Sequence, residues 1–129
     1  MTFDFSFYRR SIIVKAQITG VKETRNVTFL LDTGASKTII DNDAAKRLGF
    51  DLKQFKTGDR LMTANGGVTS KTLELPNFSL LGKDLVNFEV NVLTLPAQIT
   101  YFADGLLGMD FLLQFDSIKF DFEKKIIET

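Results

Sequence analysis

The chain has 129 residues, its 16 lysines and arginines are balanced by 16 aspartates and glutamates, and it contains no histidine, cysteine or tryptophan. This length fits one domain with a sizeable core, so we expect residues 1–129 to form a single domain. The lack of histidine and cysteine excludes a Ser-His-Asp triad, a cysteine nucleophile, a disulfide, and an imidazole or thiolate metal site. Acid–base catalysis would therefore have to come from Asp, Glu, Lys or Tyr side chains.

The charge pattern also limits the partners. A net charge of zero without a long basic run argues against binding to nucleic acid. No apolar run approaches the ~18 residues that a membrane-spanning helix needs. The first ten residues place their positive charges after the apolar residues, which is the reverse of a secretory signal. We therefore expect a cytoplasmic protein with no membrane span and no nucleic-acid partner.

Alternation of apolar and polar residues dominates the chain and predicts half-buried β-strands. It runs through residues 3–7, 12–19, 86–92 and 118–122. Turn signals separate these segments, and the strongest is Asn65-Gly66, because a type I′ hairpin needs positive φ at both central residues. Most of the chain is therefore predicted to be sheet.

Signals for helices are sparse. Asp41 or Asn42 can cap a short helix that runs through Leu48, with Gly49 ending it. A second short helix is expected over residues 109–114. Together with the strands, this predicts a mostly β, single-lobe, closed β-barrel-like domain with one or two short helices.

The segment that carries chemistry is Leu31-Asp32-Thr33-Gly34-Ala35-Ser36. An apolar strand delivers a carboxylate to its end, and a turn of small residues follows at once. Gly34 allows close backbone approach and exposes amide donors, while the hydroxyls of Thr33 and Ser36 can donate hydrogen bonds to a charged carboxylate. The plainer alternative is a surface turn, since Asp, Thr, Gly and Ser are ordinary turn residues. Asp32 is the candidate catalytic residue.

This segment resembles the active-site motif of aspartic proteases. Residues 104–112, Asp-Gly-Leu-Leu-Gly-Met-Asp-Phe-Leu, resemble the second signature of the single-lobe, retropepsin-like branch. Residues 62–67, Met-Thr-Ala-Asn-Gly-Gly, lie where that family places its flap hairpin. The order and spacing of these three elements match the family, and the chain looks more like its bacterial and cellular members than its viral ones. The implied fold is the acid-protease fold.

The resemblance implies that two carboxylates share one proton and activate a water, because two carboxylates about 3 Å apart cannot both be charged. The chain holds one Asp-Thr-Gly and has no room for a second lobe. A two-fold homodimer would supply the second Asp32. The implied activity is aspartic endopeptidase cleavage of extended peptide or protein segments, without a cofactor or metal.

The resemblance also assigns roles to neighbouring residues. Thr33 would lock the two active-site loops across the dimer, Gly34 would line the substrate channel, and Ala35 and Ser36 would support the loop. The flap would close over the peptide with residues Thr63, Ala64, Asn65, Gly66 and Gly67.

Two alternatives stay open in the second motif. Leu107 and Gly108 would support the active-site loop, but a core strand that ends in a turn explains them equally well. Asp110 would brace the same loop or occupy the first turn of a helix, where a negative charge is favourable. The position after Gly108 is Met109 where viral relatives have arginine, so a viral-type ion-pair network at this corner is not expected.

Other functions compete with proteolysis. Asp41-Asn42-Asp43 lacks the residue order of a calcium loop, and a helix cap explains it. The rival from a different class is a non-catalytic peptide-binding or dimerisation module on the same fold. Residues 118–127 would form a dimer-interface sheet or part of the core.

Overall fold

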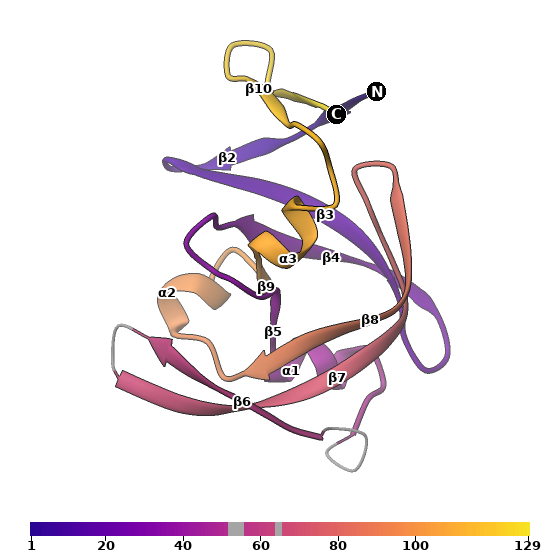
Figure 1. The fold of residues 1–129 in the computed structure, drawn as a ribbon, viewed down its shortest axis with the longest axis vertical. Coiled ribbons are helices and arrows are strands. Elements are labelled where there is room, and N and C mark those ends of the chain that lie inside the picture. The colour runs from indigo at the N-terminus through magenta and orange to yellow at the C-terminus, as the bar shows by residue number, and fades with distance from the viewer. Residues whose placement is uncertain (52–55, 64–65) are drawn as a thin grey trace.

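The structure, a computed structural model, describes residues 1–51, 56–63 and 66–129. Six strands form a closed barrel of mixed strand direction (Figure 1). Their order around the barrel is β3 (Ser11–Thr19), β4 (Thr24–Leu31), β9 (Gly105–Leu107), β5 (Ile39–Asp41), β8 (Lys83–Leu93) and β7 (Gly66–Leu80), and β7 pairs again with β3. The predicted mostly β, closed barrel-like fold is confirmed.

Two more strands pair with barrel strands and form the edges of the sheet. β2 (Ser6–Tyr8) pairs with β3, and β6 (Lys56–Thr63) pairs with β7. β6 and β7 form a hairpin in which Thr63 lies opposite Gly66 and Met62 lies opposite Gly67. Gly66 is therefore a strand residue in this register, and not a central turn residue as the Asn65-Gly66 signal suggested. Ala64 and Asn65 lie outside the described residues.

A second, smaller sheet is built from the two ends of the chain. Its order is β1 (Thr2–Asp4), β11 (Ile126–Glu128) and β10 (Lys119–Asp121), all antiparallel. The alternating segment over residues 3–7 therefore contributes to strands of two different sheets, because Phe5 separates β1 from β2. The strand expected over 118–122 is confirmed in its central three residues.

The core lies inside the barrel and extends to both sheets. In β3 the side chains of Ala16 and Ile18 are fully buried while Lys15 and Gln17 are exposed, as period-two alternation requires. Three rings fill the centre, and their edge-to-face contacts join β4, β7 and the helix after β9: Phe29, Phe78 and Phe111.

The described residues include three short helices. In α1 (Asn42–Arg47) the Asp41 side chain accepts a hydrogen bond from the Asp43 N–H, and Gly49 follows the helix with a φ of +93°, so both predicted end signals are confirmed. α3 (Met109–Leu112) is the second expected helix. α2 (Ala97–Thr100) was not predicted, and it has no side-chain cap. No helix in the described part of the chain is long and apolar enough to cross a membrane.

Candidate active site

Asp32 lies at the end of β4, where the backbone is held by a neighbouring strand. Leu31 pairs with Leu107 in the parallel β4–β9 ladder, and the Asp32 N–H donates to the Leu107 carbonyl at 3.0 Å. Asp32 is a half-buried residue, and its Oδ1 accepts a hydrogen bond from the Gly34 N–H at 2.9 Å. A Cβ added at Gly34 would lie 3.1 Å from that same oxygen. Glycine therefore leaves room for the carboxylate while supplying an amide to orient it.

The loop from Thr33 to Thr38 crosses the carboxyl end of β9. This crossing follows from the sheet order, because β9 lies between β4 and β5 and pairs with both. The chain that leaves β9 is bound to the loop, since the Met109 N–H donates to the Ala35 carbonyl at 2.8 Å and the Asp110 N–H donates to the Ser36 carbonyl at 3.1 Å. The first and second sequence motifs thus meet at one point.

Gly108 lies directly against the backbone of the loop that follows Asp32. A Cβ at this position would lie 2.6 Å from the Lys37 carbonyl oxygen and 2.9 Å from the Ala35 carbonyl oxygen. The φ of Gly108 is −98°, which any residue can adopt. Glycine is needed here for close backbone approach, and not for an unusual dihedral angle.

The Asp110 carboxylate joins the active-site loop to helix α3. Its Oδ1 accepts hydrogen bonds from the Thr38 N–H at 2.9 Å, the Thr38 hydroxyl at 2.7 Å and the Phe111 N–H at 2.8 Å. The Thr38 hydroxyl also accepts from the Gly108 N–H at 3.1 Å. Asp110 is in the first turn of the helix and in contact with the loop at the same time, so the two readings of this residue describe one arrangement.

Thr38 is a residue of this site that sequence reasoning missed. Its side chain is fully buried, although threonine is mostly an exposed residue. Its carbonyl also accepts from the Asn91 N–H at 3.0 Å, which fixes the start of β5 against β8. The only local signal was a threonine directly before the apolar pair Ile39-Ile40.

The remaining predicted loop residues are exposed or half-buried. Thr33, Gly34 and Ser36 are exposed and Ala35 is half-buried, so the turn presents small side chains next to the carboxylate. Of the predicted flap, Thr63, Gly66 and Gly67 belong to the β6–β7 hairpin.

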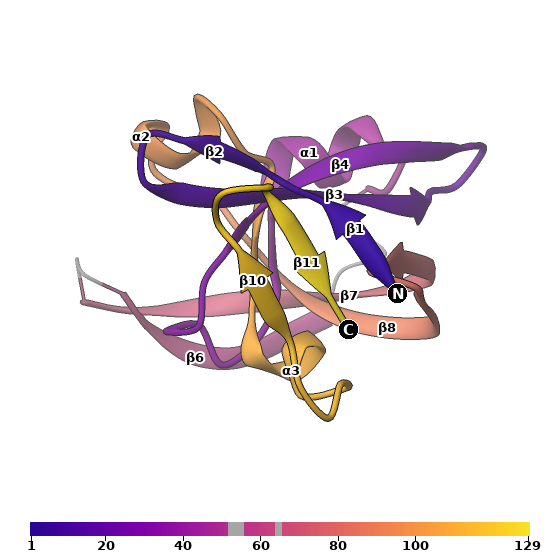
Figure 2. The same ribbon diagram turned by 90° about the horizontal axis from the view of Figure 1, so that it is seen from above.

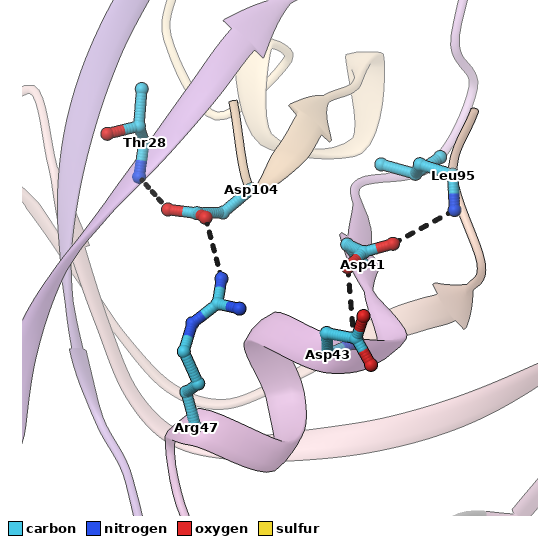
Figure 3. Close-up of polar contacts among 6 residues, drawn as sticks. All are labelled: Thr28, Asp41, Asp43, Arg47, Leu95 and Asp104. Atoms are coloured by element: carbon cyan, nitrogen blue, oxygen red, sulfur yellow. Dashed lines mark hydrogen bonds and ion pairs between the residues drawn. The ribbon is translucent and has the colours of Figure 1, made fainter. Parts of the chain in front are cut away.

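A second carboxylate cluster, Asp41 and Asp104, lies at the carboxyl end of β5 and directly before β9 (Figure 3). Asp104 accepts from the Thr28 N–H at 3.0 Å and pairs with Arg47 at 3.0 Å. Asp41 caps α1 and accepts from the Leu95 N–H at 2.9 Å. These oxygens are used by backbone donors and by the Arg47 guanidinium, and no group of three metal-binding side chains occurs among the described residues. The cluster therefore holds strands and a helix together.

Comparison with known proteins identifies relatives in sequence. The sequence model of the aspartyl protease family matches residues 14–111, a range that contains Asp32, Gly108 and Asp110. The chain is 32% identical over 95 residues to an uncharacterized protein of Rickettsia prowazekii, and the match covers 74% of this chain and 38% of that relative.

Solved structures agree with the sequence match. A retropepsin-like aspartic protease from Rickettsia conorii superposes with a TM-score of 0.72 at 26% identity, over 98% of this chain and 88% of that one. The EIAV protease in complex with an inhibitor has a TM-score of 0.64 at 19% identity, over 84% and 93% of the two chains. The retroviral protease-like domain of Ddi1 from Leishmania major has a TM-score of 0.61 at 18% identity, over 92% and 86%. The chain has the retropepsin-like fold and belongs to the aspartyl protease family.

Proposed function

We propose that this chain is an aspartic endopeptidase that acts as a homodimer, with one Asp32 from each subunit at a shared active site. The observation that carries the proposal is the position of Asp32. Asp32 is a half-buried residue at a strand end, its carboxylate accepts from the Gly34 N–H, and Gly108 and Asp110 contact the loop that follows it. Such rigid placement is what a general base needs.

A single chain supplies only half of the required chemistry. The sequence contains one Asp-Thr-Gly, and the proposed reaction needs one charged and one protonated carboxylate. The charged Asp32 takes a proton from a water, and the resulting hydroxide attacks the scissile carbonyl carbon. The protonated Asp32 gives its proton to the carbonyl oxygen, which stabilises the tetrahedral intermediate. Collapse of the intermediate, with proton transfer to the leaving amine, breaks the C–N bond.

The exposed residues around Asp32 suit this dimeric site. Thr33 and Ser36 are exposed in the single chain, where Thr33 is free to contact the partner loop. The β6–β7 hairpin, which includes Thr63, Gly66 and Gly67, offers an edge against which an extended peptide would pair as an added strand. The substrate class we propose is therefore an extended peptide or an unfolded protein segment.

The decisive test compares wild type with Asp32→Asn on a diverse peptide pool, from mildly acidic to neutral pH. Asparagine has the shape of aspartate but cannot act as a base, so the variant should fold and associate normally while losing all turnover. Thermal unfolding and sedimentation of both proteins provide the control. Equal cleavage by both proteins would overturn the proposal, and peptide binding without cleavage by wild type would favour a non-catalytic binding module.

A further inference from the structure

An open cleft of about 550 Å³ lies between the β2–β3 turn and helix α2. This volume is within the range of clefts that bind small ligands. The turn contributes Tyr8, Arg9 and Ser11 to its lining, and α2 with the residues after it contributes Gln98, Tyr101 and Phe102.

The strand register places one end of this cleft beside Asp32. Ile13 of β3 lies opposite Leu30 of β4, and continuing this antiparallel register by two residues sets Ser11 opposite Asp32. Figures 1 and 2 show the β2–β3 turn, α2 and the loop after β4 on the same side of the molecule. With strands about 5 Å apart and a rise of about 3.3 Å per residue, a peptide bound at Asp32 would pass the cleft about two to four residues from its scissile bond.

The walls of the cleft are aromatic rings in contact with one another. Tyr8 stacks on Phe102, with ring centroids 4.3 Å apart and planes 11° from parallel. The Tyr8 centroid is also 6.1 Å from that of Tyr101, a residue that is 80% exposed. These contacts join the turn to the segment after α2. The rings therefore offer apolar surface to the methylene groups of a bound side chain.

Arg9 gives the cleft a positive charge. Its Cζ lies 5.6 Å from the centroid of the Tyr8 ring, so the guanidinium rests over that ring. Arg9 is exposed, and no carboxylate among the described residues pairs with it. None of the described residues that line the cleft is acidic. The guanidinium can therefore make a planar, two-point contact with a carboxylate from another molecule.

The backbone at Arg9 has a conformation that arginine rarely adopts. Its φ is +55°, at the first position of the two-residue turn that joins Tyr8 to Ser11. Glycine, asparagine or aspartate usually occupies such a position, because a β-carbon there costs free energy. The turn itself does not explain the arginine, and an uncommon backbone conformation of this kind points to a use for the side chain.

We propose that this cleft is a specificity site that takes a substrate side chain with a carboxylate. Arg9 binds the carboxylate, and the rings of Tyr8 and Tyr101 cover the methylene groups. The proposal rests on the proposed function and narrows its substrate class to extended segments with glutamate or aspartate near the scissile bond. A two-fold homodimer has one such cleft in each subunit, so acidic residues are favoured on both sides of that bond.

The test measures kcat/KM on peptide pairs that differ only by glutamate or glutamine, at each of about four positions on either side of the cleaved bond. Glutamine keeps the shape of glutamate and loses its charge. Wild type should prefer glutamate about fivefold at one or more positions, and the preference should fall at higher ionic strength. Arg9→Asn should bring the ratio to about one, and Arg9→Lys should retain part of it. Equal rates of wild type on every pair would overturn the proposal.

The matched control is Arg10→Asn. Arg10 is the second residue of the same turn, is exposed and carries the same charge, but it does not line the cleft. This variant should keep the preference for glutamate, and an equal loss in both variants would assign the preference to long-range attraction and overturn the cleft. Asparagine suits a φ of +55°, so Arg9→Asn should have a thermal midpoint no lower than that of wild type.

A binding measurement separates this proposal from the proposed function. A random peptide library is incubated with Asp32→Asn protein, and the bound peptides are sequenced. Glutamate and aspartate should be enriched, and adding Arg9→Asn should remove the enrichment. Enrichment that depends on Arg9, without cleavage by wild type, would overturn only the proposed peptidase. Cleavage that depends on Asp32, with no acidic preference or with enrichment of aromatic residues alone, would overturn only the specificity site.

Discussion

The Thr38 hydroxyl donates a 2.7 Å hydrogen bond to Oδ1 of Asp110, across 72 positions of sequence. The same hydroxyl accepts a hydrogen bond from the Gly108 N–H, so one buried threonine connects the loop after Asp32, the end of β9 and helix α3. These hydrogen bonds hold the loop that begins at Asp32 at its other end, at Thr38.

Asp110→Ala should destabilise the fold by about 1–3 kcal/mol, because the Thr38 and Phe111 N–H groups and the Thr38 hydroxyl lose their shared acceptor. Urea denaturation at neutral pH measures this loss. Asp110→Asn retains one acceptor oxygen and should lose less. The control is Asp116→Ala, because Asp116 is an exposed aspartate that follows α3; this variant should stay within about 0.5 kcal/mol of wild type. Equal stability of the Asp110 and Asp116 variants would contradict the bracing role.

Gly108→Ala should be strongly destabilising, because its methyl group would overlap the Lys37 and Ala35 carbonyls, which are backbone atoms and cannot rotate away. We expect a loss of about 1–3 kcal/mol or failure to fold, measured by thermal unfolding. Gly34→Ala is the informative comparison. Its added Cβ meets only the Asp32 carboxylate at 3.1 Å, in an exposed turn. That variant should keep its thermal midpoint and lose peptidase activity, and a reversed pattern would refute this assignment of the two glycines.

Asp104→Ala should cost about 1–3 kcal/mol of unfolding free energy, because the half-buried Thr28 N–H loses its acceptor. Arg47→Ala should cost no more than about 0.5 kcal/mol, since the arginine side chain is 58% exposed and surface ion pairs contribute little. Chemical denaturation of the two single variants and the double variant separates these contributions. If Arg47→Ala cost as much as Asp104→Ala, the ion pair would be the dominant interaction and this argument would fail.

Phe111→Ala should destabilise the chain by about 3–5 kcal/mol, because its fully buried ring packs against Phe78 and Phe115 with centroids 5.4 and 5.6 Å away. The neighbouring Leu113 provides the control, as its side chain is 73% exposed. Leu113→Ala should leave the unfolding midpoint nearly unchanged. The measurement is thermal unfolding followed by circular dichroism, and similar midpoints for the two variants would contradict the placement of Phe111 in the core.

The retropepsin-like family and the main strands could be predicted from sequence, because both depend on local patterns. Period-two alternation identified β3 and β8, and the Asp41 cap with Gly49 identified α1. Asp32, Gly108 and Asp110 were predicted as site residues because each lies in a short motif. Their structural contacts agree with a common site, while their roles in catalysis stay predictions.

Only the tertiary structure decided how distant segments meet. Thr38 could not be selected from sequence, since its burial and its bond to Asp110 depend on β9 lying between β4 and β5. The four-residue helix α2 has no side-chain cap, so no local signal marked it. The pairing of β1 with β11 likewise joins residues at opposite ends of the chain. The sequence by itself determined local conformation and the chemistry of the motif, because these depend on neighbours within a few residues. The order of the strands, the burial of polar side chains and the identity of the edge strands could be known only from the folded chain. All three depend on contacts between residues far apart in sequence.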